Sequence, residues 1–170
     1  MGTKICLFFY GISVLFNASG YFTSHWEVTG YDDYHAGLWV ACRNGMCKST
    51  TNNLCYFEAT QVLETLSLVT GSLGLLLLTF YYFISRTSFD VSLCVASLIA
   101  VAFSGCCALL AVIIYGCKTS FALSWSFALA VIGGLCYGIT AILLAVYLIN
   151  SSDKYKKYRD SHQGPVQHYV

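Results

Sequence analysis

Residues 91–115 have the sequence VSLCVASLIAVAFSGCCALLAVIIY, which contains no acidic, basic or histidine side chain. A helix needs about 20 predominantly apolar residues to cross the hydrocarbon core of a bilayer, and this stretch is long enough to do so. Three other stretches also qualify. The four predicted spans are residues 5–22, 62–84, 91–115 and 121–149. The sequence therefore predicts an integral membrane protein of the all-α class with four transmembrane helices.

The composition of the whole chain agrees with a membrane protein. Of its 170 residues, 57% are apolar and 10% are charged, whereas soluble globular domains are about 25% charged. The net charge of +1 creates no field that would attract nucleic acid, so nucleic-acid binding is not expected. The one basic cluster follows the last span directly and is expected to face anionic lipid heads. It consists of Lys154, Lys156, Lys157 and Arg159.

The first predicted span is more polar than the others, with Ser13, Asn17 and Ser19 inside it. Lys4, the apolar run after it and the small residues at 18–20 also fit a cleavable signal peptide. We interpret residues 5–22 as a transmembrane helix, and cleavage after it is the alternative.

The orientation follows from the distribution of Lys and Arg, because short cytoplasmic segments are enriched in both. Six of the nine lie on one side of the predicted membrane and three on the other. This asymmetry predicts that both termini, including the tail 151–170, are cytoplasmic and that the loop 23–61 is extracellular. The six are Lys4, Arg86 and the tail cluster, and the three are Arg43, Lys48 and Lys118.

Small residues recur at four-residue spacing in the later spans. Such stripes let helix backbones approach closely, which is how helices associate in lipid. They predict a compact, left-handed four-helix bundle. The stripes are Ser92, Ala96, Ala100, Ser104 and Ala108 in the third span, Ser126, Ala130, Gly134 and Gly138 in the fourth, and Ser67 and Gly71 in the second.

Groups that could carry catalysis or ion transport are scarce inside the spans, where ionisable residues usually mark such functions. Glu64 lies near the outer end of the second span and is expected to be a snorkelling or hydrogen-bonded carboxylate rather than a proton relay. The four histidines show no metal-ligand spacing. The sequence therefore predicts no catalytic residue, no metal site and no cofactor, and the chain is not expected to be an enzyme.

The loop 23–61 carries three cysteines, Cys42, Cys47 and Cys55, and Cys117 lies in the second extracellular connection. Extracellular cysteines are disulfide candidates, and four of them allow three pairings that sequence alone does not separate. We favour Cys42–Cys47, with Cys55–Cys117 as a possible second bridge. The alternation in residues 39–42 suits the strands of a small sheet. The other five cysteines lie within spans and are expected to be reduced.

The loop motif resembles that of the claudin superfamily, whose members include claudins, peripheral myelin protein, epithelial membrane proteins, the lens fibre membrane protein and calcium-channel gamma subunits. The matching residues are Trp26, Gly37, Leu38, Trp39, Cys42 and Cys47. Residues 58–61, EATQ, and 121–127, FALSWSF, are also similar to segments of members. The resemblance covers a domain of residues 1–150.

This resemblance implies a fold in which the first loop forms an extracellular antiparallel β-sheet on a left-handed four-helix bundle. Cys42–Cys47 would bridge two strands of the sheet, and Trp39 would seat the sheet on the bundle near the lipid surface.

The chain departs from claudins in its short second connection, residues 116–120. It ends with Tyr169 and Val170, which resembles the claudin ending that binds PDZ domains of zonula occludens scaffolds by strand addition.

The resemblance implies a junctional protein of the plasma membrane that has an adhesion or paracellular barrier role. Its partners would be other claudin-like proteins in cis and in trans. The alternative is a cis-acting accessory or membrane-organising subunit, like the gamma subunits or the myelin and epithelial members.

Overall fold

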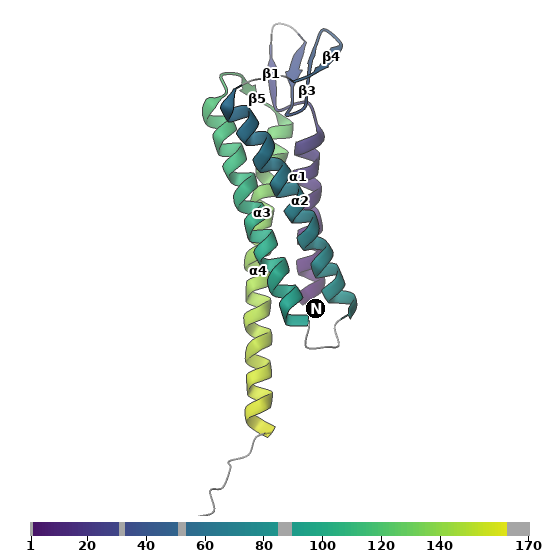
Figure 1. Ribbon diagram of the computed structural model, residues 1–170, viewed down its shortest axis with the longest axis vertical. Helices are drawn as coiled ribbons and strands as arrows, with labels where there is room; N and C mark the ends of the chain where they lie inside the picture. Colours follow the sequence, from purple (N-terminus) through teal and green to yellow (C-terminus); the bar gives the residue numbers. More distant parts are fainter. Residues whose placement is uncertain (1, 31–32, 51–53, 85–89, 163–170) are drawn as a thin grey trace, which may run out of the picture.

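The computed structural model describes residues 2–30, 33–50, 54–84 and 90–162. Four helices form a bundle, and a small β-sheet covers the end opposite the N-terminus (Figure 1). The helices are α1 (Gly2–Phe22), α2 (Cys55–Ile84), α3 (Asp90–Lys118) and α4 (Trp125–His162). The strands are β1 (Glu27–Thr29), β2 (Tyr34–Ala36), β3 (Val40–Arg43), β4 (Met46–Ser49) and β5 (Ala122–Leu123).

The four predicted spans are confirmed as helices that are long and apolar enough to cross a membrane. Their exposed surface carries large apolar side chains, as lipid-facing helices require. The membrane-compatible segments are Thr3–Phe22, Cys55–Phe83, Ser92–Lys118 and Trp125–Ser151.

Two helices begin at other residues than the predicted spans. Helix α2 begins at Cys55 rather than near Val62, because its first turns form an amphipathic helix under the sheet instead of a loop. Phe57 and Thr60 are buried there while Glu58 is exposed. The fourth helix begins at Trp125 rather than Phe121, because the residues just before it pair with the sheet.

Helix α4 is the longest and projects beyond the other three helices at the end away from the sheet (Figure 1). Helix α4 therefore does not end at residue 150, the predicted boundary between span and tail. The helix continues through the basic cluster to His162.

Within the bundle, α1 packs chiefly against α4, and α2 against α3. Two clusters of buried side chains fill the interior, one toward the N-terminal end of α1 and one beneath the sheet. The first contains Cys6, Tyr10, Leu78, Cys94, Val101, Tyr137 and Leu144. The second contains Trp26, Leu38, Phe57, Val112, Tyr115 and Ala130.

The residues of the small-residue stripes differ in how closely they approach a neighbouring helix. A Cβ added to Gly134 would be 3.0 Å from the Leu109 side chain, so α3 and α4 are in close contact there. Gly138 would meet nothing within 4 Å. The buried Ser104 hydroxyl donates to the Ser67 carbonyl at 2.6 Å and so joins α3 to α2.

The other stripe positions on α3 differ in burial, and Ala108 is fully buried. Ala96 and Ala100 are half-buried. The Ala100 methyl lies 2.8 Å from where a Cβ on Gly74 would be, so α2 and α3 approach closely at this level.

The sheet has five strands in the order β4-β3-β2-β1-β5, and every neighbouring pair is antiparallel. Four strands come from the first loop, which was predicted to form an antiparallel sheet. The fifth, β5, comes from the connection between α3 and α4, where Ala122 pairs with Val28 and Leu123 with Glu27. The short second connection is therefore part of the sheet.

Candidate functional site

The indole of Trp26 anchors the sheet in the bundle. Trp26 has no exposed surface, and its ring packs edge-on against Tyr115 and Phe127 at centroid distances of 5.0 and 5.6 Å. Its Nε1 donates a 2.7 Å hydrogen bond to the carbonyl of Gly20. That carbonyl lies in the last turn of α1, where helix carbonyls have no partner within the helix. Trp26 thus holds α1, α3 and α4 together beneath β1.

Glu27, the next residue, fixes the start of β1 to α3. Its side chain is 7% exposed, and its Oε2 accepts hydrogen bonds from the Tyr115 hydroxyl at 3.1 Å and the Thr119 hydroxyl at 2.9 Å. A buried carboxylate is costly unless donors satisfy it, and these two hydroxyls do so. Sequence reasoning missed this role, because the donors lie about 90 residues away along the chain.

Gly37 and Leu38 of the sequence motif lie at the base of the sheet. A side chain at Gly37 would overlap the carbonyl oxygen of Thr23 and lie 2.6 Å from the Cα of Ser24, so only glycine fits. Leu38 is fully buried, and its carbonyl accepts a 2.6 Å hydrogen bond from Gln61 of α2.

Trp39 lies where the sheet meets α1 and α2. Its ring is 40% exposed and contacts that of Tyr21 at 5.4 Å. With Gln61, Val62, Thr65 and Leu66 it lines a pocket of about 260 Å³. Trp39 therefore lies at the junction between sheet and bundle, and its role in seating the sheet stays a prediction. The buried anchor, however, is Trp26.

The Cys42–Cys47 disulfide is present and joins β3 to β4. The two cysteines are directly opposite each other, with Cα atoms 4.0 Å apart. Between them Asn44 and Gly45 make the turn with φ angles of 51° and 77°. An Asn-Gly pair is the preferred sequence for such two-residue hairpins, so it could have predicted this turn, although sequence reasoning missed the signal.

The possible second bridge is not formed. Cys55, at the start of α2, and Cys117, near the end of α3, are both exposed free thiols. The hairpin disulfide is therefore the one cross-link within the described residues.

Replacing Cys42 or Cys47 by Ser should lower the free energy of unfolding by about 2 kcal/mol, because the lost cross-link closes only a short loop. We also expect much of the protein to be retained before the cell surface. Thermal unfolding in detergent and surface biotinylation measure the two effects, and Cys55→Ser is the matched control. Peptide mapping that finds Cys42 and Cys47 as free thiols would contradict the assignment.

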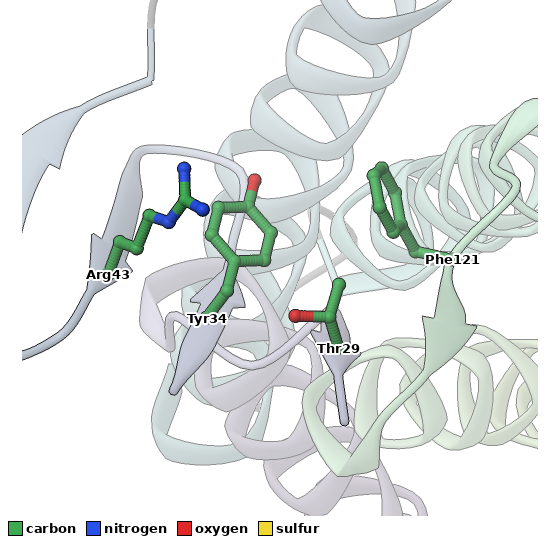
Figure 2. A pocket seen from close by; sticks show the side chains of 4 residues that line it. All are labelled: Thr29, Tyr34, Arg43 and Phe121. Atoms are coloured by element: carbon green, nitrogen blue, oxygen red, sulfur yellow. The ribbon is translucent and has the colours of Figure 1, made fainter. Parts of the chain in front are cut away.

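The sheet carries a pocket of about 350 Å³, lined by Thr29 of β1, Tyr34 of β2, Arg43 of β3 and Phe121 just before β5. Arg43 lies beside the Tyr34 ring, Phe121 stands opposite, and Thr29 is between them (Figure 2). Burial, followed by the nearby Glu27 carboxylate, raises the pKa of the Tyr34 hydroxyl, while Arg43 acts in the opposite direction. The hydroxyl therefore remains a hydrogen-bond donor at neutral pH.

A second pocket of about 430 Å³ adjoins the first and shares Thr29 and Tyr34 with it. His25 and His35 line it with their rings stacked at 4.2 Å, and Trp125 stacks on His25 at 5.2 Å. Burial, and to a lesser extent His35, lower the pKa of His25, which favours its neutral form. The two pockets together, which we call the outer sheet surface, combine aromatic rings with the Arg43 guanidinium and the Asp33 carboxylate.

The described part of the chain contains no group of three or more His, Cys, Asp or Glu side chains placed to hold a metal ion. The outer sheet surface offers rings, hydroxyls, a cation and a carboxylate for contact with another molecule. Tyr169 and Val170, the predicted PDZ-binding residues, lie outside the described residues.

One family model, the PMP-22/EMP/MP20/Claudin family, matches residues 1–149. The structure agrees with this match, since it has four apolar helices, a sheet built on Trp26, Gly37 and Leu38, and a bridged hairpin. The chain belongs to this family. Its members are structural membrane proteins and are not known as enzymes. No curated protein matches the chain in a sequence comparison. The family and the four spans make it a multi-pass membrane protein.

Proposed function

We propose that this member of the claudin family is a structural protein of cell–cell junctions in the plasma membrane. Its sheet would be extracellular and would contact claudin-like partners in the same and the opposing membrane. Its cytoplasmic end, Tyr169 and Val170, would bind PDZ scaffolds and retain the protein at contacts.

The observation that carries this proposal is the outer sheet surface. Trp26 and Glu27 fasten the sheet to the bundle, while the pocket of Thr29, Tyr34, Arg43 and Phe121 stays accessible. Tyr, Trp and Arg are the residue types enriched at binding hot spots, and a rigid support reduces the entropy lost on binding. A surface of this kind, held firmly away from the bilayer, suits contact with another membrane protein.

The alternative is a cis-acting accessory or membrane-organising role. It is favoured by the connection between α3 and α4, residues 119–124, which is short and contributes β5 to the sheet. No separate second loop is left to reach an opposing cell.

The two functions differ in the dependence on the C-terminus. Deleting Val170, or adding one residue after it, should abolish binding of a tail peptide to zonula occludens PDZ domains, because the terminal carboxylate and the last side chain are recognised together. In cells, junctional clustering should weaken while surface delivery is unchanged. Imaging of contacts between expressing cells, with surface biotinylation as the control, measures both effects. Undiminished clustering of the truncated protein would make the accessory role the better proposal.

A further inference from the structure

Asn17 of α1 and Glu64 of α2 face each other inside the bundle, and both side chains have no exposed surface. The Asn17 Nδ2 donates a 2.8 Å hydrogen bond to Glu64 Oε2. The other oxygens of the two groups, Glu64 Oε1 and Asn17 Oδ1, are buried without any hydrogen-bond partner. The amide and the carboxyl are thus joined by one bond, and one acceptor on each side is left over.

An ionised Glu64 cannot satisfy these two atoms. A carboxylate and an amide carbonyl are both acceptors only, so neither can donate to the other. A buried charge without a paired cation or a full set of donors is also strongly unfavourable in a membrane interior. Glu64 interacts electrostatically with Cys107 of α3 and Tyr137 of α4, and neither of these is a cation.

Protonation of Glu64 removes both the buried charge and the two unsatisfied acceptors. A proton on Oε1 makes that oxygen a donor, and Asn17 Oδ1 is the natural acceptor for it. A carboxylic acid and a primary amide then close a ring of two hydrogen bonds, in which each group donates once and accepts once. We propose that Glu64 binds a proton and, as the neutral acid, forms this closed pair with Asn17, which clasps α1 to α2 within the membrane.

At this location the Asn17–Glu64 pair helps to hold the helix bundle together. Helix α1 packs mainly on α4, and α2 mainly on α3, so polar pairs help to join the two halves of the bundle. The Tyr21 hydroxyl bonds to the Thr65 hydroxyl at 3.0 Å about one turn further along α1 and so adds a second link. On the opposite side, a Cβ at Gly133 would lie 2.8 Å from the Asn17 backbone nitrogen, so α4 holds Asn17 tightly in place.

The clasp also lies close to the sheet. Gln61, about one helical turn before Glu64, donates to the Leu38 carbonyl at the base of the sheet. A change of the charge on Glu64 would therefore act directly beneath the point where the sheet rests on α2.

Infrared difference spectroscopy of the purified protein in detergent at neutral pH tests the proton directly. Subtracting the spectrum of Glu64→Gln from that of the wild type should show the C=O stretch of a protonated carboxyl, shifted to lower frequency in D₂O. Glu58→Gln, which alters an exposed acid at the start of the same helix, is the matched control and should show loss of an ionised carboxylate. A band of an ionised carboxylate in the difference spectrum between wild type and Glu64→Gln would overturn the proposal. It would do so whether water or a cation bridges the ionised pair.

Thermal unfolding tests the clasp. Glu64→Gln mimics the neutral acid, since its amide can donate to Asn17 Oδ1, and it should unfold at the wild-type temperature. Glu64→Ala and Asn17→Ala should unfold several degrees lower. Asn17→Asp places two acids together and should be destabilised at neutral pH. The double variant Asn17→Asp with Glu64→Gln exchanges acid and amide between the helices, and its unfolding temperature should return to the wild-type value. If Glu64→Gln is as unstable as Glu64→Ala, or if the exchange fails to rescue, the closed pair does not exist.

Discussion

Replacing Gly37 by Ala should destabilise the protein by about 3 kcal/mol, the upper end of what overpacking usually costs. The added methyl group would overlap the Thr23 carbonyl oxygen and approach the Ser24 Cα to 2.6 Å. Both obstacles are backbone atoms and cannot rotate away as a side chain could. The strand cannot retreat either, because the Ala36 carbonyl accepts a 2.8 Å hydrogen bond from the Trp26 nitrogen. Thermal unfolding in detergent measures the loss, and surface biotinylation should show retention inside the cell.

Gly30→Ala is the matched control for this prediction. Gly30 follows β1 in the same sheet, and a Cβ there would meet nothing within 4 Å. The control should leave the unfolding temperature and surface delivery unchanged. Equal behaviour of the two variants would mean that the segment after α1 does not pack against Gly37 as described.

The transmembrane helices were predictable because their signal is local. A run such as residues 91–115 has no charged side chain, and α3 contains it entirely. The start of α2 was missed for the same physical reason. Its first turns carry Glu58 and Gln61, and hydropathy alone does not mark an amphipathic extension of the helix toward the sheet.

The sheet was predictable in part. The alternating residues at 39–42 and the cysteine pair indicated a hairpin, and β3 and β4 form it. Strand β5 was not predictable, because it has two residues and depends on pairing with β1, about 95 residues earlier in the chain. Tertiary context of this kind determines strands more than local preference does.

The functional residues were likewise predictable only in part. Sequence identified Trp26, Trp39 and Glu64 as notable, and it left open whether Glu64 was snorkelling or hydrogen-bonded. Their burial separates them: Trp26 and Glu64 are fully buried, and Trp39 is 40% exposed. That outcome depends on partners from other helices, such as Asn17 for Glu64, and no local pattern reports them.

Replacing Trp26 by Ala should lower the free energy of unfolding by about 3–5 kcal/mol, the usual cost of truncating a buried Trp. The indole fills the space between Tyr115, Phe127 and the end of α1, so a cavity would open directly beneath β1. The substitution also leaves the Gly20 carbonyl without its donor. Trp26→Phe should be milder, because it keeps most of the apolar volume and loses the Nε1 hydrogen bond. Thermal unfolding in detergent should rank the proteins as wild type, Trp26→Phe and Trp26→Ala.

Trp125→Ala provides the control within the same chain. Trp125 lies at the start of α4, is 50% exposed and stacks on His25, so its loss removes little buried surface. Its unfolding temperature should stay close to that of the wild type. Trp26 also supports β1, the strand that contains Glu27. Trp26→Ala should therefore expose the Tyr115–Glu27 contact to solvent as well. Increased protease cleavage between residues 23 and 36 would report this exposure. Equal loss of stability in the two Trp→Ala variants would show that Trp26 is not the anchor of the sheet.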